Sequence, residues 1–500
     1  MGEVHPRDES EAVSPSSAAA APARATAAPS GVTRALAEHA ASLSYDALPP
    51  RLVERIRQIV LDTLGVSIGA STLAAEAKIV VDYVSELGGR PQSRILGFGG
   101  RAPAAWAVFA NGSLGHMLDY DDVGGGGHVG IATVPVAFAL AEKRGGVSGR
   151  DLIAAIAAGT DLQVRLNQAI DIPDWTMTEG WFATQLFGFI SGTATAARLL
   201  GLTVEETENA FGLAYTQLSG SRQMAVGTAT HLRSMQAGFS GQGAVLSAEL
   251  ARRGIVGSRE IIEGRYGFFR NYVRTGQPDW HAIVGELGVR FPLLDVHGFK
   301  VWPACGYTRP TNTATLALRR EHGIRPEDVE AITIIGGTGA TQLLSEPLEL
   351  KRRPKLSIDG KYSIPFTTAV MMVKGNVTLR DYTEEGLRDA RVLAMADRVS
   401  YRPEPGTVIA AGGSSSVSRP TVEIRLKDGR SYSNKAAGVP GDPQHPVTQE
   451  SLEAKFRDCV SFAAKPLAAA DVERAIALIR DLENVPDVTE IMQLLTPSES

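Results

Sequence analysis

The sequence has few cysteines and no excess of positive charge, and each shortage excludes a class of protein. The two cysteines among 500 residues, Cys305 and Cys459, cannot build the disulfide framework of a secreted scaffold. Lysine and arginine number 50 against 55 aspartates and glutamates, so the chain lacks the basic face that nucleic acid binding requires. We therefore expect a cytoplasmic protein in a reducing compartment, with no nucleic acid partner.

Long apolar stretches are also missing. No run approaches the roughly 18 to 20 apolar residues of a membrane span, so we expect no membrane partner. Residues 1–31 contain no apolar core of a secretory signal and are rich in Ala, Pro and Ser, which predicts a disordered tail. A transit peptide is the alternative, although its acidic residues argue against that, because such leaders are poor in acid.

Helical periodicity dominates from about residue 33 to 272. Apolar residues recur at helical spacing after Pro50, a residue favoured in the first turn of a helix. Thr203 and Glu206 have the spacing of a capping box. Glycine is abundant, at 52 residues, and much of it lies in Ala- and Gly-rich helical segments. This pattern predicts closely packed helices.

The pattern changes after about residue 280. Segments 329–337 (VEAITIIGG) and 421–434 (TVEIRLKDGRSYSN) are rich in β-branched residues, and the second contains the turn dipeptide Asp-Gly. Helical spacing resumes near the C-terminus, where Asp471 is the expected N-cap of a late helix. We predict a mainly α protein with a large all-α domain, residues 32–288 and 436–495, and an inserted smaller α+β lid domain, residues 289–435.

Segment 111–135, NGSLGHMLDYDDVGGGGHVGIATVP, concentrates groups that can transfer protons. An imidazole titrates near neutral pH, and a neighbouring carboxylate can fix its tautomer. The alternatives are a solvated acidic loop or a metal site, although the spacing matches no zinc or calcium template. The side chains concerned are those of His116, Asp119, Asp121, Asp122 and His128.

Two further segments contain candidate binding groups. Segment 299–310, FKVWPACGYTRP, supplies cations and hydroxyls suited to a carboxylate ligand, because a guanidinium can bind a carboxylate through two bonds. Within it, Cys305 is either a nucleophile or a small buried residue. Arg233, in His-Leu-Arg before a glycine-rich helix, is either a ligand-binding cation or part of an exposed helix start.

Several segments, in order from about residue 45 to 460, resemble those of one family. They are DALPPRLVERIRQIVLDTLGVSIGA, NGSLGHMLDYDD followed by His128, GFKVWPACGYTRPTNTA, KYSIPFTTAVMMVKG and PGDPQHPVTQESLEAKF. The chain thereby resembles the MmgE/PrpD family, which includes 2-methylcitrate dehydratase and cis-aconitate decarboxylase. The resemblance implies the two-domain fold described above and a homodimer without cofactor. It also implies proton transfer next to a carboxylate, followed by loss of water or carbon dioxide.

The resemblance and the chemistry of the segments described above together indicate roles for individual residues. His128, oriented by Asp119, would be the catalytic base, and glycines 124–127 would let its loop close. Arg233 and Lys300 would hold the anionic group of a small carboxylate substrate. The other substrate-binding candidates are His116, His297, Tyr307 and Arg309, and no residue is assigned to a metal.

Four positions depart from the family pattern. Arg233 replaces a lysine, Trp181 or Phe182 replaces a helix-start histidine, Cys305 or Arg309 replaces a histidine, and Phe366 replaces a tyrosine of the decarboxylase branch. Aromatic side chains in place of histidine and tyrosine make the pocket less polar. Such a pocket offers fewer partners to the carboxylates of a substrate, and an unpaired carboxylate is costly to desolvate. We therefore expect a substrate that is smaller, less charged or partly apolar compared with the family's named substrates.

Three functions are compatible with these residues. The leading hypothesis is a lyase of the dehydratase or decarboxylase type. An isomerase or epimerase would use the same base without a leaving group. A binding protein that has lost catalytic groups is the third.

Overall fold

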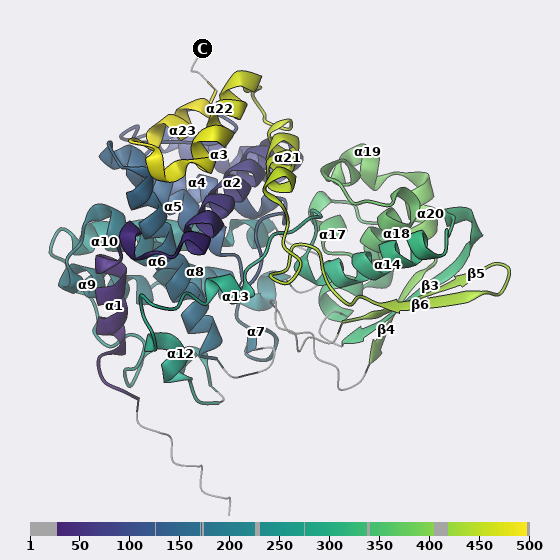
Figure 1. The fold of residues 1–500 in the computed structure, drawn as a ribbon, viewed down its shortest axis with the longest axis horizontal. Helices are drawn as coiled ribbons and strands as arrows, with labels where there is room; N and C mark the ends of the chain where they lie inside the picture. The colour runs from purple at the N-terminus through teal and green to yellow at the C-terminus, as the bar shows by residue number, and fades with distance from the viewer. Residues whose placement is uncertain are drawn as a thin grey trace, which may run out of the picture.

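The computed structural model describes residues 28–125, 127–170, 172, 175–225, 231–274, 276–337, 341–404 and 419–497. Within these ranges the chain is mainly α with a small α+β portion, which confirms the predicted fold class (Figure 1). The predicted disordered tail lies outside the described residues except for its last four. The predicted domain boundaries, at residues 288/289 and 435/436, stay predictions.

The larger part of the molecule is a bundle of helices. Helix α21 packs against α2, so the C-terminal helices lie beside the N-terminal ones (Figure 1). One hydrophobic core draws on both ends of the chain, from Leu52 in α2 to Met492 in α23. The principal helices are α1 (Val32–Ser42), α2 (Pro50–Leu73), α3 (Ala75–Glu86), α4 (Ala104–Met117), α5 (Val129–Arg144), α6 (Gly149–Gln168), α8 (Ala183–Leu200), α9 (Val204–Tyr215), α10 (Gln236–Ala251), α21 (Gln449–Val460), α22 (Ala469–Arg480) and α23 (Thr489–Leu494).

Local signals set where several of these helices begin. Helix α2 starts at Pro50, and α9 starts behind a complete capping box of Thr203 and Glu206, as predicted. The prediction for α22 is wrong: its N-cap is Ala468, and Asp471 lies in the first turn, where its charge still favours the helix N-terminus.

Close contacts between helices account for some of the glycine. A Cβ added at Gly159 of α6 would lie 2.2 Å from Thr195 Oγ1 of α8, and one at Gly188 would lie 2.5 Å from Ser240 Oγ of α10. Side chains at these positions would push the helices apart.

The smaller part contains a four-stranded sheet with the order β4-β3-β5-β6. Strands β3 and β4 are parallel, and the helices between them form the crossover that a parallel pair requires. Helices α14 and α18 lie against the sheet (Figure 1), and their apolar side chains share a second core with it. The elements are β3 (Val329–Gly337), β4 (Val399–Glu404), β5 (Thr421–Leu426), β6 (Ser431–Lys435), α14 (Arg309–Glu321), α16 (Leu348–Arg352), α17 (Ser357–Lys361), α18 (Ile364–Lys374), α19 (Glu384–Leu387) and α20 (Ala390–Ala396).

None of the described helices is by itself long and apolar enough to span a membrane. Helices α2 and α3 pass such a test only as a pair, which is bent by 98°.

Short elements connect the larger and the smaller part. The short elements are β1 (Ser93–Arg94), β2 (Arg101–Ala102), α7 (Trp175–Thr178), α11 (Phe268–Tyr272), α12 (Trp280–Val284), α13 (Leu293–Val296), η1 (Tyr45–Ala47), η2 (Arg222–Ala225), η3 (His231–Met235), η4 (Gly306–Thr308), η5 (Pro326–Asp328), η6 (Thr341–Ser345), η7 (Leu379–Tyr382) and η8 (Leu482–Asn484).

Candidate active site

The segment between α4 and α5 turns sharply at its first aspartate. Asp119 has a left-handed backbone conformation, with φ of 47°, and its N–H donates to the carbonyl of His116 at 2.9 Å. Such a conformation is uncommon outside glycine and is found more often for Asp and Asn. The turn brings three buried aspartates, Asp119, Asp121 and Asp122, into one short loop.

The glycines that follow are needed for close packing. Val123 and Gly298 exchange two backbone hydrogen bonds, which tie the loop to the segment carrying Lys300. A Cβ at Gly124 would lie 2.1 Å from Val296 O, and Gly124, Gly125 and Gly127 all have positive φ. Gly126 lies outside the described residues. These contacts give the glycines a packing role, and the predicted loop closure stays a prediction.

Asp121 holds both histidines of the segment. His116 Nδ1 lies 2.9 Å from Asp121 Oδ1, and His128 Nδ1 lies 2.8 Å from Asp121 Oδ2. His128 Nδ1 also lies 2.6 Å from the backbone oxygen of Asp122. Because each of these neighbours is an acceptor, the proton sits on Nδ1 in both rings, and Nε2 retains its lone pair. The partner of His128 is therefore Asp121, which corrects the predicted pairing with Asp119.

Burial and charge set the protonation of this group. Burial lowers the pKa of His116, which favours its neutral form. Burial alone would raise the pKa of Asp121, but the two imidazoles and the Lys300 ammonium outweigh it and hold that pKa well below its usual range. A carboxylate that stays ionised next to two Nδ1–H groups fixes two basic Nε2 atoms in the site.

Asp119 pairs with Lys300 instead. The Lys300 ammonium lies 2.5 Å from Asp119 Oδ1 and donates to Asp119 O at 2.9 Å, although the two residues are 181 positions apart in the chain. Burial opposes ionisation of Asp119, but Lys300 and the nearby cations prevail and lower its pKa to about 2. Lys300 is fully buried, so this pair joins the loop to the segment before α14.

His297 supports the loop from a position away from the other imidazoles. Its Nε2 lies 2.8 Å from Asp122 Oδ2, which also accepts from Gly130 N at 2.8 Å. Arg55 NH1 lies 3.2 Å from His297 Nδ1 and donates to the His297 carbonyl. With both ring nitrogens engaged and its side chain fully buried, His297 is placed to hold Asp122.

Arg233 lies between two aromatic rings. Its guanidinium carbon is 4.5 Å from the centroid of Phe182 and 4.0 Å from that of Tyr362. In the part of the chain that the structure describes, Arg233 has no ion pair, and its Nε and NH1 have no hydrogen-bond partner although both are buried. The aromatic faces stabilise the cation but leave its N–H groups available to an anion.

Other polar atoms of this region also lack partners among the described residues. Buried polar groups are normally hydrogen-bonded, so such a concentration is typical of a site that a ligand completes. The atoms are His116 Nε2, Asp119 Oδ2, Arg233 Nε and NH1, Tyr362 Oη and Tyr382 Oη. This set combines a cation, hydroxyl donors, a base and one carboxylate oxygen.

The same loop brings together three side chains of the kind that bind metal ions. One ligand atom each from His116, Asp121 and His128 lies within 4.8 Å of the others. The Asp121 oxygens, however, lie at hydrogen-bond distance from both Nδ1 atoms, and Lys300 Nζ lies 3.9 Å from Asp121 Oδ1. We interpret the group as a hydrogen-bond network in which a lysine supplies the positive charge.

Three residues predicted near Lys300 are placed differently. Arg309 donates to Pro440 O at 2.7 Å and pairs with Asp442 at 2.8 Å, so its charge is used to hold the 440–442 turn. Tyr307 is half-buried against the second core. Cys305 is buried, and burial raises its thiol pKa to about 11, so it suits a packing role better than that of a nucleophile.

Sequence reasoning missed the residues contributed by segment 361–382. Tyr362 stacks on Arg233, and Lys361 donates to Met117 O at 3.0 Å, while burial lowers the pKa of Lys361 to about 8. Both are the first residues of the segment KYSIPFTTAVMMVKG, which carries the family resemblance, and this position is the sequence signal that could have identified them. Phe366 itself is fully buried in the second core, and the tyrosines supply hydroxyls that its phenyl ring lacks.

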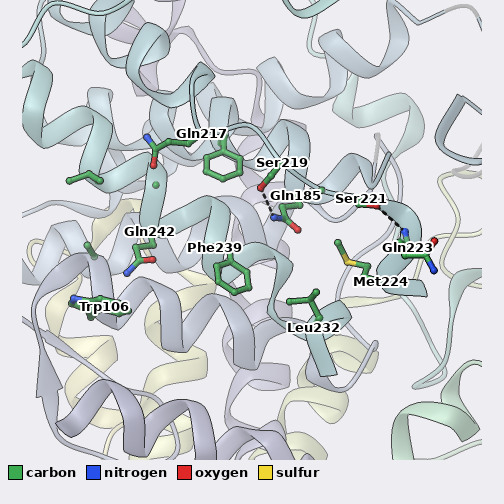
Figure 2. A pocket seen from close by; sticks show the side chains of 15 residues that line it. Trp106, Gln185, Gln217, Ser219, Ser221, Gln223, Met224, Leu232, Phe239 and Gln242 are labelled. Atoms are coloured by element: carbon green, nitrogen blue, oxygen red, sulfur yellow. Dashed lines mark hydrogen bonds between the residues drawn. The ribbon is translucent and has the colours of Figure 1, made fainter. Parts of the chain in front are cut away.

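A separate pocket of about 1010 Å³ opens on the helical part (Figure 2). None of the predicted site residues lines it, although Leu232 and Gln185 in its wall are near neighbours in sequence of Arg233 and Phe182. Glutamines and apolar side chains dominate the wall, including Gln217, Gln242 and Phe239. It lacks the charged groups of the buried cluster.

The comparison with protein families agrees with this architecture. The MmgE/PrpD N-terminal domain matches residues 34–281, and the MmgE/PrpD C-terminal domain matches residues 302–484. Together they cover most of the chain, which belongs to the MmgE/PrpD family.

Similar curated proteins span nearly the whole chain. The chain is 24% identical over 485 residues to cis-aconitate decarboxylase of Homo sapiens, covering 93% of this chain and 94% of that protein. It is 25% identical to the Mus musculus protein of the same name, covering 93% of each, and 25% identical to that of Aspergillus terreus, covering 93% and 96%. The family and these relatives support a lyase.

Proposed function

We propose that the protein is a lyase that acts on a small carboxylate by proton transfer next to a carboxylate or carbonyl, with no cofactor. The proposal rests on two features together: the pair of imidazoles held by Asp121, and the buried Arg233, which makes no ion pair with a described residue and is close enough to Asp119 to lower its pKa. A base with a fixed tautomer and an anion-binding cation are the two groups that abstraction of such a proton requires.

His128 is the proposed base. Its Nδ1 is occupied by Asp121 and Asp122 O, and its Nε2 has no hydrogen bond within the described ranges. Asp121 then stabilises the imidazolium that forms when Nε2 takes the proton. His116 shares the same carboxylate, and the two rings have centroids 4.5 Å apart, so it can exchange the proton with the substrate or with His128.

Arg233 is the proposed carboxylate-binding group. Lys300 is already neutralised by Asp119, and Lys361 donates to a backbone carbonyl, whereas the Arg233 guanidinium makes no ion pair with any of the residues described. A single free guanidinium suits a substrate with fewer carboxylates than cis-aconitate, a tricarboxylate. The apolar ring of Phe182, in direct contact with Arg233, agrees with a partly apolar ligand.

Asp119 Oδ2 favours a substrate that carries a donor. A buried carboxylate oxygen repels a second carboxylate but accepts a hydrogen bond from a hydroxyl or an amino group. This favours dehydration of a hydroxy acid. His128 removes the proton next to the carboxylate, the electron pair forms the double bond, the C–O bond breaks, and the hydroxyl leaves as water with a proton returned by the imidazolium.

The experiment is a screen of the purified full-length chain in D₂O. Hydroxy, amino and unsaturated mono-, di- and tricarboxylates are followed by proton NMR for double-bond formation, carbon dioxide loss and deuterium exchange. We expect one acid to lose water or carbon dioxide with wild-type protein and not with a His128→Ala variant of unchanged unfolding temperature. Full turnover by His128→Ala on the true substrate would overturn the proposal.

An isomerase or epimerase is the alternative. The two imidazoles on one carboxylate can remove and return a proton with no leaving group. Deuterium incorporation without loss of water or carbon dioxide would favour this reaction. A binding protein without activity is the remaining alternative; it would bind an acid from the panel with neither exchange nor turnover.

We further propose a homodimer in the cytoplasm. Leu232 and Phe239, which line the surface pocket (Figure 2), are large exposed apolar residues, and so is Leu246 in the same wall; a second subunit would cover them. Sedimentation velocity would show twice the mass of the chain, and a monomer at micromolar concentration would contradict the dimer.

A further inference from the structure

A buried lysine in helix α21 makes contacts that the proposed reaction does not use. Lys455 Nζ donates to the backbone oxygen of Tyr120 at 2.5 Å and to that of Lys300 at 3.1 Å. It also lies 2.6 Å from Asp62 Oδ1 of α2 and 3.8 Å from the centre of the Tyr120 ring. An ammonium has three N–H groups, and here three acceptors from three segments surround it.

Two of those acceptors, the carbonyl oxygens of Tyr120 and Lys300, belong to the segments that form the proposed active site. Tyr120 lies between Asp119 and Asp121, the carboxylates that pair with Lys300 and the imidazoles. The second acceptor is the carbonyl of Lys300 itself. Lys455 therefore joins the backbone of the aspartate loop to the backbone of the segment that supplies its cation, while the Lys300 side chain makes the direct bond to Asp119.

We propose that Lys455 is a positioning residue of the active site, which fixes the aspartate loop relative to Lys300 by bonding the Tyr120 and Lys300 carbonyls. The inference rests on the proposed function of that loop. Asp62 serves as the counter-ion that keeps a buried ammonium stable in the helical core, and both side chains are almost fully buried. The end of the chain thus takes part in the site without touching a substrate.

The choice of variants separates positioning from general stability. Lys455→Met alone leaves Asp62 buried without a counter-ion and can unfold the protein. The double variant Lys455→Met with Asp62→Asn removes both charges and is expected to fold. Asp62→Asn alone keeps the ammonium and both carbonyl bonds. Lys143→Met removes a lysine–glutamate pair, Lys143 with Glu249, that lies outside the site and serves as the control.

Two readouts are needed, because the substrate itself is a proposal. The first is the kcat and KM of each variant on the acid found by the screen. A displaced loop is expected to lower kcat of the double variant on the order of 10²-fold, since a misplacement of about 1 Å has that effect. KM should change little, because Arg233 is untouched. Asp62→Asn and Lys143→Met should keep most of the wild-type kcat.

The second readout is independent of turnover. In full-length protein with labelled histidine, the ring Cε1–H signals of His116 and His128 are assigned with single variants and compared. We expect the double variant to shift both signals, and Asp62→Asn and Lys143→Met to leave them nearly in place. Wild-type kcat and unmoved signals in a folded double variant would overturn the proposal. If the double variant shifts the two histidine signals but keeps the wild-type kcat on every acid, the proposed function is contradicted and the positioning role is supported.

Discussion

Two neighbouring groups of buried residues differ in how their hydrogen bonds are made. The imidazole cluster, formed by His116, Asp119, Asp121, His128 and Lys300, is joined by ion pairs and hydrogen bonds of 2.5–2.9 Å. The guanidinium cluster, formed by Phe182, Arg233 and Tyr362, is held by stacking and leaves buried N–H and O–H groups unpaired in the described part of the chain.

The difference separates a cluster whose charges are already paired within the protein from a cluster whose charge awaits a ligand. Leaving a buried polar atom unpaired costs on the order of 1–3 kcal/mol, more for a charged group, so the guanidinium cluster is stabilised when an anion binds. The imidazole cluster is stable without a ligand and holds its charges ready for proton transfer. Substitutions in the imidazole cluster should therefore affect stability, and those in the guanidinium cluster should affect binding.

Lys300→Met is expected to have the largest effect on stability. It leaves Asp119 as a buried anion without its partner, which costs on the order of 3–5 kcal/mol. Chemical denaturation followed by circular dichroism measures the loss. The matched change Arg233→Met should lower the unfolding free energy much less, and equal losses in the two variants would remove the distinction between the clusters.

Arg233→Met should instead weaken anion binding. We expect the affinity for the substrate carboxylate to fall on the order of 10²-fold, because a buried charge pair with the ligand is lost. Titration calorimetry with the acid from the screen, at a pH where it is ionised, measures the change. Arg233→Lys keeps the charge and should recover part of the affinity; unchanged binding in Arg233→Met would place the carboxylate elsewhere.

The Asp119–Lys300 pair should also appear in the dependence of stability on pH. The folded-state pKa of Asp119 is about 2, below its ordinary value of 3.8. Its contribution, about 2 kcal/mol, is thus fully present above about pH 4 and is lost as the pH falls towards 2. Denaturation between pH 5 and 2 should show a steeper loss in wild type than in Asp119→Asn.

Tyr362→Phe should have a smaller effect on binding. The phenyl ring keeps the stacking on Arg233, while the buried hydroxyl that has no partner among the described residues is removed. We expect the free energy of unfolding to be unchanged or slightly raised and the affinity to fall by the worth of one hydrogen bond, about 1 kcal/mol. Unchanged affinity would exclude the hydroxyl from the ligand's contacts.

Alkylation of Cys305 should have the smallest effect of all. Burial raises its thiol pKa to about 11, so almost no thiolate forms at pH 8. Iodoacetamide at that pH should leave native activity intact, as followed by residual turnover with mass spectrometry of the Cys305 peptide. Rapid modification that parallels inactivation would restore the cysteine as a reactive group.

The elements that sequence analysis placed correctly depend on local signals. The start of α2 at Pro50 and the capping box of α9 involve residues a few positions apart, so their geometry follows from the chain nearby. The exception is α22, where Asp471 fitted the cap pattern but stands in the first turn. Helix ends shift by a residue or two whenever tertiary packing favours another cap.

The pairings within the site depend on long-range contacts. Asp119 is close enough to His128 in sequence to orient it. Its left-handed turn, however, places its carboxylate against Lys300, which is 181 positions away. Arg309 likewise pairs with Asp442, and Tyr362 reaches Arg233 because Tyr362 shares the second core with Phe182, the other ring in contact with Arg233. A sequence motif therefore identified the loop, whereas the partner of each side chain required the fold.

The central claim, that His128 held by Asp121 moves a proton next to a carboxylate bound by Arg233, is tested most directly by solvent deuterium exchange. Wild-type protein, His128→Ala and Arg233→Met are each incubated in D₂O with the acid from the screen. Exchange and turnover are followed by NMR at saturating and at limiting concentrations of the acid. We expect His128→Ala to bind the acid still but to lose exchange on the order of 10²-fold or more. Exchange at the wild-type rate in His128→Ala would contradict it.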